Sequence, residues 1–313
     1  MGAYHFLGAA HRVPRTSSWR SRLRTIPPAP SARPPLRLPA PLRLSPPLRL
    51  PAPPGLPHRA VCEFGLTAVL LLAVVTGVRW LFAPDGYGGG GAAFALLGAG
   101  VGALLAVLMV SAPGRRSGGH LNPAVTLALW RLGAFPGRDV VPYLVAQLSG
   151  SVVGTWLAGL VWGPVVSGPP VSHAVVRPGP GWGDGAVVAA EAGVLAGSAL
   201  LLAGLLARPV GRRVLPYAVG AVTALVIAVL GPLSGGSANP ARQFGPALLS
   251  GEPGLLGVYG GGPVLGAVAG AGLVAVVRGR LGAGLAAVAY RRLGGPPVRH
   301  GRPWQSRVRP RRP

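Results

Sequence analysis

The chain has few charged residues, and lysine is missing altogether. Only 12% of the residues are charged, against roughly 25% in a soluble domain, and all 30 basic residues are arginines. Half of the chain is hydrophobic, which indicates a membrane protein. Cys62 is the one cysteine, so no intrachain disulfide can form, and the Cys and His spacing of a zinc site is absent. We therefore expect no metal and no cofactor.

The formal net charge of +24 does not indicate a nucleic-acid-binding protein, because ten arginines precede Val61 and ten follow Val277. Most of the charge thus lies in the two tails. Residues 1–58 carry proline at high density, which excludes both a helix and the apolar core of a signal peptide. We interpret 1–58 as a disordered tail or as sequence upstream of the true start, with contact to anionic lipid as the alternative. Residues 59–278 are the predicted membrane domain and 279–313 a basic tail.

Six hydrophobic stretches are each long enough to cross a hydrocarbon core, which takes about 20 residues as a helix. Two further apolar segments begin near Asn122 and Asn239 and end after only about ten residues, too few to cross. We predict that these two are re-entrant half-helices. The predicted fold class is therefore an all-α membrane protein with six transmembrane helices and two half-helices. The six stretches are 60–83, 92–112, 140–166, 186–207, 215–230 and 256–277.

The arginines in the short loops predict the orientation of the chain, because cytoplasmic loops are enriched in arginine and lysine. Two of the loops carry most of these arginines, namely the loop between the second and third stretches and the loop between the fourth and fifth. We expect both loops and both termini to be cytoplasmic in a multi-pass protein of the plasma membrane. The arginines concerned are Arg115, Arg116, Arg131, Arg138, Arg208, Arg212 and Arg213.

One eight-residue motif occurs twice. The first copy, at 117–124, reads Ser-Gly-Gly-His-Leu-Asn-Pro-Ala, and the second, at 234–241, reads Ser-Gly-Gly-Ser-Ala-Asn-Pro-Ala, so six of eight positions are identical. Each copy follows the second span of a three-span half, 59–166 or 184–278. An odd number of crossings makes the two halves face opposite ways, which predicts two inverted repeats whose motifs enter the membrane from opposite faces.

The residue types of the motif suit a helix that begins in the middle of the membrane. An asparagine can cap free backbone N–H groups and still offer amide donors to a lumen, and proline fits the first helical turn. Two such helix starts that meet bring together two positive dipole ends, each about half an elementary charge. Cations and protons are then repelled, whereas neutral solutes can bond to the amides. The signature residues are Asn122, Pro123 and Ala124 in the first copy and Asn239, Pro240 and Ala241 in the second.

The paired Asn-Pro-Ala signatures in two hydrophobic halves, with Arg242 after the second, resemble the aquaporin (major intrinsic protein) family. The resemblance covers about residues 60–278. It implies a passive channel for water or small uncharged solutes in the lipid bilayer, and a homotetramer with one pore per subunit. It also implies that Glu63 and Glu191 accept hydrogen bonds from the re-entrant loops. Proton or ion coupling is the alternative role of these two carboxylates.

The resemblance further implies a constriction made of four residues. Arg242 matches the constriction arginine of the family, and counting back from the two asparagines without gaps places the other positions at Gly102, Ile227 and Gly236. A slip of one residue in the second span would replace Gly102 by Val101. Water channels typically have an aromatic residue and a histidine at the first two positions. Gly and Ile predict a wider, less polar opening, which favours solutes such as glycerol or urea.

Other positions favour water over glycerol. Gln243 and Ala247 stand where glycerol-conducting members of the family have an aspartate and a basic residue, and Tyr259 resembles the water channels, although Gly260 replaces an expected tryptophan. The choice between the two solutes therefore stays open. His120 stands where the family often has histidine, and it could contact the solute, respond to pH or brace the loop.

Two other classes of protein fit parts of this pattern. A coupled secondary transporter also uses inverted repeats and broken helices, but only Glu63 and Glu191 of the six acidic residues fall within the predicted spans. A membrane-embedded enzyme needs a nucleophile or a metal cluster, and the spans hold no Ser/His/Asp or His/Glu arrangement. We therefore predict no catalytic residues and a passive channel, with the coupled carrier as the alternative.

Overall fold

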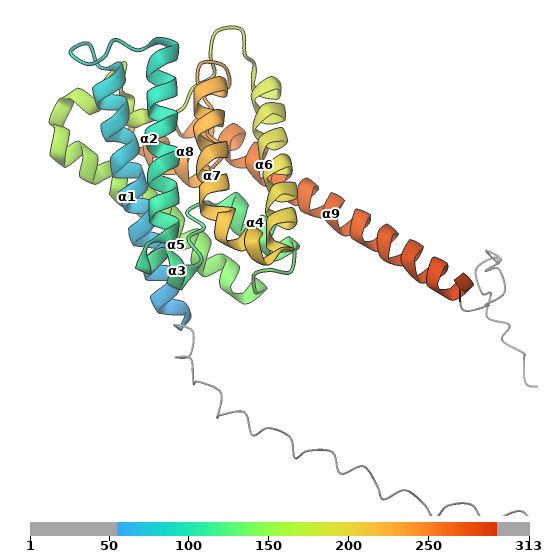
Figure 1. The fold of residues 1–313 in the computed structure, drawn as a ribbon. Helices are drawn as coiled ribbons and strands as arrows, with labels where there is room; N and C mark the ends of the chain where they lie inside the picture. Colours follow the sequence, from blue (N-terminus) through green and yellow to red (C-terminus); the bar gives the residue numbers. More distant parts are fainter. Residues whose placement is uncertain (1–54, 293–313) are drawn as a thin grey trace, which may run out of the picture. The chain divides into compact units, whose positions relative to one another are not determined.

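Helices account for every regular element in the part of the chain that the structure describes. The computed structural model covers residues 55–292, with side chains for 55–280 (Figure 1). Six of the helices are long and apolar enough to cross a membrane, as predicted. These six are α1 (Leu56–Phe82), α2 (Gly90–Val110), α5 (Val140–Trp162), α6 (Asp184–Leu206), α7 (Pro209–Leu230) and α9 (Leu256–Arg292).

The ends of the long helices differ from the hydrophobic stretches, most of all at α7 and α9, and α1 begins at Leu56, inside the predicted tail 1–58. Helix α7 begins at Pro209, six residues before the predicted start at 215, because proline suits the first helical turn even where the following arginines lower the hydropathy. Helix α9 continues to Arg292, past the predicted end at 277 and into the predicted basic tail. Hydropathy measures how much of a helix suits lipid and not how long the helix is. The rest of the predicted tails, 1–54 and 293–313, lies outside the described residues.

The two segments that are too short to cross the membrane are helices α4 (Pro123–Arg131) and α8 (Pro240–Leu249). Each begins at the proline of one motif copy, as the sequence predicts. The connections contain short α or 3-10 turns. These are α3 (Ala112–Ser117), η2 (Gly137–Asp139), η3 (Gly163–Val166), η4 (Ser172–Ala174) and η5 (Pro253–Leu255).

The packing of the helices repeats between the two halves of the chain. Helix α1 packs on α5 in the first half, as α6 packs on α9 in the second. Half-helix α4 packs on α9, and half-helix α8 packs on α5, so each half-helix rests on a long helix of the opposite half. Helices α2 and α7 pack on each other. Equivalent helices of the two halves thus have equivalent packing partners, as expected of two inverted repeats.

Glycines bring the paired helices together at their crossings. A Cβ atom added to Gly102 would collide with the carbonyl oxygen of Gly220, and one added to Gly220 would collide with that of Gly102, so α2 and α7 touch backbone to backbone. Gly154 approaches α1 and Gly266 approaches α6 in the same way. Lipid tails are as apolar as these helices, so close packing at small residues, more than burial from water, holds such a bundle together.

We predict that Gly102→Leu destabilises the fold, because its side chain has no room between α2 and α7. Overpacking of this kind costs about 1–3 kcal/mol or more, which thermal unfolding of the detergent-purified protein will show as a lower midpoint. Gly100→Leu is the matched control on the same helix, since Gly100 is exposed and faces open space. Equal midpoints for the two variants would show that the α2 and α7 crossing is misplaced.

Candidate functional site

The two half-helices are capped by the asparagines of the two motifs. The Asn122 side-chain oxygen Oδ1 accepts a hydrogen bond from the backbone N–H of Ala124 at 2.9 Å, and Asn239 Oδ1 accepts one from the N–H of Ala241, also at 2.9 Å. Both asparagines have extended backbones and are followed by proline at the first helical position. Each asparagine thus ends the loop and starts the helix, as residues of this type do at helix N-termini.

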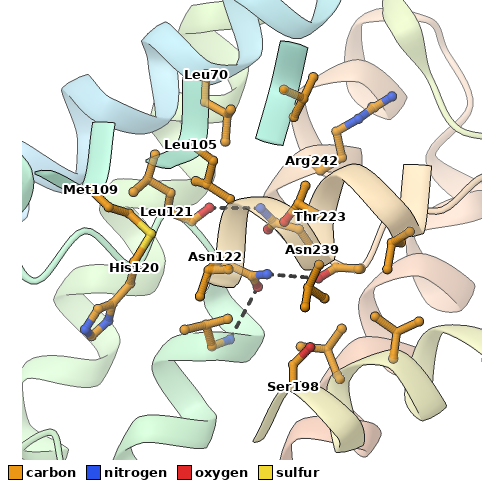
Figure 2. A pocket seen from close by; sticks show the side chains of 18 of the residues that line it. Leu70, Leu105, Met109, His120, Leu121, Asn122, Ser198, Thr223, Asn239 and Arg242 are labelled. Atoms are coloured by element: carbon orange, nitrogen blue, oxygen red, sulfur yellow. Dashed lines mark hydrogen bonds between the residues drawn. The ribbon is translucent and has the colours of Figure 1, made fainter. Parts of the chain in front are cut away.

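Each asparagine also bonds to the loop of the other half, which brings the two motifs into contact (Figure 2). The side-chain nitrogen of Asn122 donates to the carbonyl of Ala238 at 2.9 Å, and that of Asn239 donates to the carbonyl of Leu121 at 2.9 Å. An amide NH2 group has two donors. One donor of each asparagine therefore joins the two loops, and the second is available to the cavity that both asparagines line. The cross-loop bonds could not be read from the sequence, because they require the two motifs to touch.

Glu63 of α1 holds the first loop. Its side chain is fully buried, and its carboxylate accepts from the backbone N–H of His120 at 3.0 Å, from that of Leu121 at 2.8 Å and from Nε2 of Gln147 at 2.9 Å. Irregular backbone in a membrane has no water to bond to, so these N–H groups need an acceptor from the protein. Glu63 supplies it, in the geometry that loop bracing requires.

Glu191 of α6 holds the second loop in the same manner. It is 1% exposed, and it accepts from the backbone N–H groups of Ser237 at 3.0 Å and Ala238 at 2.5 Å and from the hydroxyl of Ser234 at 3.3 Å. The two glutamates occupy equivalent helices of the two halves. The carboxylate of each glutamate therefore accepts hydrogen bonds from the loop of its own half.

Two tyrosines brace the loops from the other side, and sequence reasoning missed this role. The hydroxyl of Tyr143 donates to the carbonyl of Ser117, and that of Tyr259 donates to the carbonyl of Ser234, both at 2.6 Å. Both tyrosines are fully buried. A signal was present, since Tyr143 lies 26 residues after Ser117 and Tyr259 lies 25 residues after Ser234. The same residue type at nearly the same spacing in both halves indicates a shared structural role.

His120 contacts both the loop and the cavity. Its Nδ1 atom lies 3.0 Å from the hydroxyl of Thr126, and its ring packs edge-on against Phe135 and at a tilt against Tyr143, at centroid distances of 4.8 and 5.2 Å. His120 also borders the cavity beside Asn122. These contacts favour loop bracing among the roles that the sequence left open.

Two cavities meet beside the second motif. The inner one, about 120 Å³, contains the two asparagines and is otherwise mostly apolar, with Ser198 and Thr223 among its few polar side chains (Figure 2). The outer one, about 150 Å³, is bordered by residues 170–177 of the connection between α5 and α6. Residues that line both cavities mark the place where one gives way to the other. They are Val74, Val101, Ile227, Gly236 and Arg242.

The prediction that Gly102 lines the constriction was wrong. Gly102 faces the backbone of α7, whereas Val101 lines both cavities. Counting back from Asn122 assumed a constant distance between motif and constriction. Here the contact between Gly102 and Gly220 sets the rotation of α2, and this rotation turns the preceding residue, Val101, toward the cavities. The slip of one residue considered in the sequence analysis is thus what the structure shows.

Arg242 supplies the one positive side chain shared by the two cavities. Its Nη1 atom donates to the carbonyl oxygen of Ala174 at 2.7 Å, and the half-buried side chain borders both cavities. Among the described residues that line these cavities, none is acidic. The lining of the two cavities therefore combines positive charge with mostly apolar walls.

Comparison with known proteins identifies a family and a shared fold. A sequence model of the family described as major intrinsic protein matches residues 56–274. The probable aquaporin AqpM of Archaeoglobus fulgidus is 40% identical over 180 residues, which cover 55% of this chain and 72% of that protein. The glycerol uptake facilitator protein of Haemophilus influenzae is 34% identical over 201 residues, covering 53% and 75%. The crystal structure of the aquaglyceroporin from Plasmodium falciparum shares the fold, with a TM-score of 0.60 and 22% identity over 69% of this chain and 94% of that one.

We predict that Glu63→Leu strongly destabilises the fold, because it leaves the N–H groups of His120 and Leu121 buried without an acceptor. Each such group costs about 1–3 kcal/mol, which thermal unfolding in detergent will measure. Glu252→Ala is the control, since it removes a carboxylate from a partly exposed ion pair with Arg177, worth about 1 kcal/mol or less. A Glu63→Leu variant that melts with the control would contradict the bracing role.

Proposed function

Because the chain belongs to the major intrinsic protein family, we propose that it is a passive channel for water and small uncharged solutes whose selectivity is set by Asn122, Asn239 and Arg242. The observation that carries the proposal is the meeting of two helix N-termini, each capped by an asparagine, at the wall of one cavity. Relatives named as an aquaporin and as a glycerol uptake facilitator support the same class of activity. The family is one of channels and not of enzymes.

The paired half-helices favour neutral solutes for an electrostatic reason. The N-terminus of each half-helix carries about half an elementary positive charge. The N-termini of α4 and α8, which meet here, therefore both repel a cation or a proton. A neutral molecule can instead accept a hydrogen bond from the free amide N–H of Asn122 or Asn239, which compensates part of its lost hydration. No opposite charge holds the molecule in place, so it can leave as easily as it enters.

The constriction favours solutes larger than water. Val101 and Ile227 present aliphatic side chains and Gly236 presents none, while Arg242 offers donors on one side only. A polyol such as glycerol has a carbon face and a hydroxyl face, which match the aliphatic and the arginine sides of such an opening. Urea, which is small and uncharged, belongs to the same candidate class. These residues support a channel for water and for solutes of about this size.

The coupled carrier lacks an acidic group in the passage. Glu63 and Glu191 line neither cavity, and their oxygens accept hydrogen bonds from the loops. A carboxylate committed to several donors is poorly placed to take up and release a proton or cation in each transport cycle. An uphill accumulation of solute driven by an ion gradient would nevertheless favour a carrier, since a channel can only speed equilibration.

We further propose a homotetramer in the plasma membrane with both termini in the cytoplasm. The family resemblance supports the tetramer, and the arginines near α3 and at the start of α7 support the orientation. Many large apolar side chains on the long helices are exposed, among them Val107 of α2 and Trp156 of α5. Such faces suit contact with lipid or with neighbouring subunits.

Osmotic shrinkage of proteoliposomes tests the activity. We expect vesicles that contain the full chain to shrink faster than empty vesicles after an osmotic step, with a low activation energy, and to take up glycerol faster as well. Both measurements use light scattering on the same preparation. If neither water nor glycerol moves faster than in empty vesicles, the channel proposal is wrong.

We predict that Val101→Phe lowers glycerol permeability more than water permeability, because an aromatic ring narrows the opening between Ile227 and Arg242. We expect the ratio of glycerol to water permeability to fall about tenfold, the effect of about 1.4 kcal/mol on one barrier. Val107→Phe is the matched control, since Val107 lies on the same helix and is 59% exposed. An unchanged ratio in Val101→Phe would move the constriction away from Val101.

A further inference from the structure

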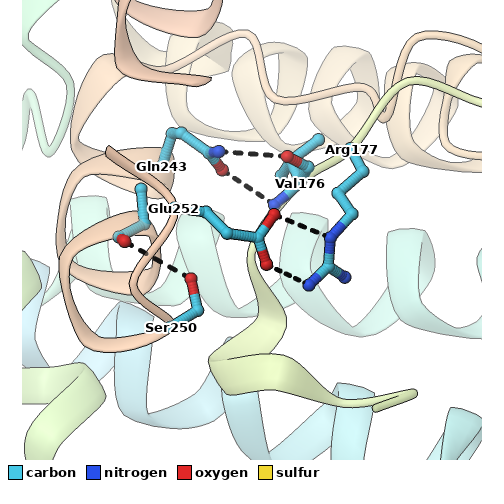
Figure 3. Close-up of polar contacts among 6 residues, drawn as sticks. Val176, Arg177, Gln243, Ser250 and Glu252 are labelled. Carbon is cyan, nitrogen blue, oxygen red and sulfur yellow. Dashed lines mark hydrogen bonds and ion pairs between the residues drawn. The ribbon is translucent and has the colours of Figure 1, made fainter. Parts of the chain in front are cut away.

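Gln243 makes a two-point contact that the proposed function does not use. It directly follows Arg242 in α8, and its side chain is fully buried. Its Oε1 atom accepts from the backbone N–H of Val176 at 2.8 Å, and its Nε2 atom donates to the carbonyl of the same residue at 3.0 Å (Figure 3). One carboxamide thus pairs with both polar backbone groups of one residue, as a neighbouring strand would, and holds Val176 at a fixed distance and orientation.

The segment that Gln243 holds is also the segment that holds Arg242. Residues 170–177 border the outer cavity, and the carbonyl of Ala174, two residues before Val176, accepts the hydrogen bond from Arg242. Both partners of this arrangement, Arg242 and Gln243, are neighbours in α8. Half-helix α8 therefore holds one short stretch of chain at two points, through two adjacent side chains.

The backbone that leads up to and includes Ala174 is strained. Ser172, His173 and Ala174 have φ angles of 42°, 52° and 61°, in the left-handed region that residues other than glycine rarely adopt. Such residues persist only where the surrounding structure holds them. The two bonds to Val176, two residues after this stretch, are buried contacts able to hold it.

Two other ties act farther along the segment. Arg177 forms an ion pair with Glu252, in which both side chains are partly exposed (Figure 3), and the N–H of Gly179 donates to the carbonyl of Leu233 at 2.6 Å. Both lie beyond Val176, on the side away from Ala174. A partly exposed ion pair also contributes little to stability. The two hydrogen bonds of Gln243 are therefore the buried contacts of this segment nearest to the Ala174 carbonyl, which accepts from Arg242.

We propose that Gln243 is a positioning residue for the constriction, which fixes the Ala174 carbonyl through Val176 and thereby the orientation of the Arg242 guanidinium. This inference rests on the proposed function and adds a specificity-determining residue to it. With the Ala174 carbonyl in place, the Arg242 guanidinium stays against the wall of the cavities, and the width of the opening is fixed. Without it, the long Arg242 side chain gains rotamers, the opening widens, and polyols pass more readily relative to water.

The variant that tests this proposal is Gln243→Met, which keeps the length of the side chain and removes both hydrogen bonds. In proteoliposomes with equal amounts of inserted protein, we expect the ratio of glycerol to water permeability to rise about tenfold, the effect of about 1.4 kcal/mol on the relative barriers. Uptake of the four-carbon polyol erythritol should rise in the same direction. Glu252→Ala, which breaks the neighbouring ion pair, should leave the ratio unchanged.

A double-mutant cycle separates a positioning role from a general loss of structure. If Gln243 acts through Arg242, then adding Gln243→Met to Arg242→Val should not change the ratio further, because the positioned group is gone. An unchanged ratio in Gln243→Met, or an equal rise with and without Arg242, would overturn the proposal. Should Gln243→Met not reach the membrane, Gln243→Asn, too short to hold both bonds, is expected to raise the ratio, and an unchanged ratio there overturns it equally. A failure of the proposed function is distinct, since the unaltered chain would then conduct neither water nor glycerol.

Discussion

The structure depends on hydrogen bonds between two buried glutamates and the backbone of the two re-entrant loops. Loops inside a membrane have no water to satisfy their N–H groups, and Glu63 and Glu191 take that place. With the loops held from the glutamate side and by tyrosine hydroxyls from the other, the two half-helices begin next to each other. The asparagine caps can then bond across the interface between the halves. The carboxylates of Glu63 and Glu191 thus position the asparagines that line the cavity, although they do not line it themselves.

In the channel that we propose, the same geometry selects by charge without a binding site that traps the solute. Two helix starts and Arg242 supply positive potential, and the walls between them are aliphatic or backbone. Both glutamates are committed to the loops and stay outside the cavities, so the negative charge that the fold needs does not attract cations into the passage. Structural and functional requirements are met by different residues, since the glutamates hold the loops, whereas the asparagines and Arg242 line the cavities.

Much of this could be predicted from the sequence because it is encoded locally. Hydropathy predicts the six spans, two short apolar segments predict the half-helices, and the cap and proline of each motif predict where these begin. What depends on contacts between distant segments was not accessible. Counting residues placed Gly102 at the constriction, whereas the backbone contact with Gly220 turns Val101 there instead. The two hydrogen bonds between Gln243 and Val176 join positions 67 residues apart, and no local sequence pattern indicates them.

The central claim is that the meeting of two helix N-termini admits neutral molecules and repels charge. The most direct measurement follows water flow and proton flow in the same proteoliposomes, with light scattering for water and an enclosed pH dye for protons. We expect that water permeability rises with the amount of inserted protein while proton permeability stays at the level of empty vesicles. A proton permeability that rises in parallel with water permeability would contradict it.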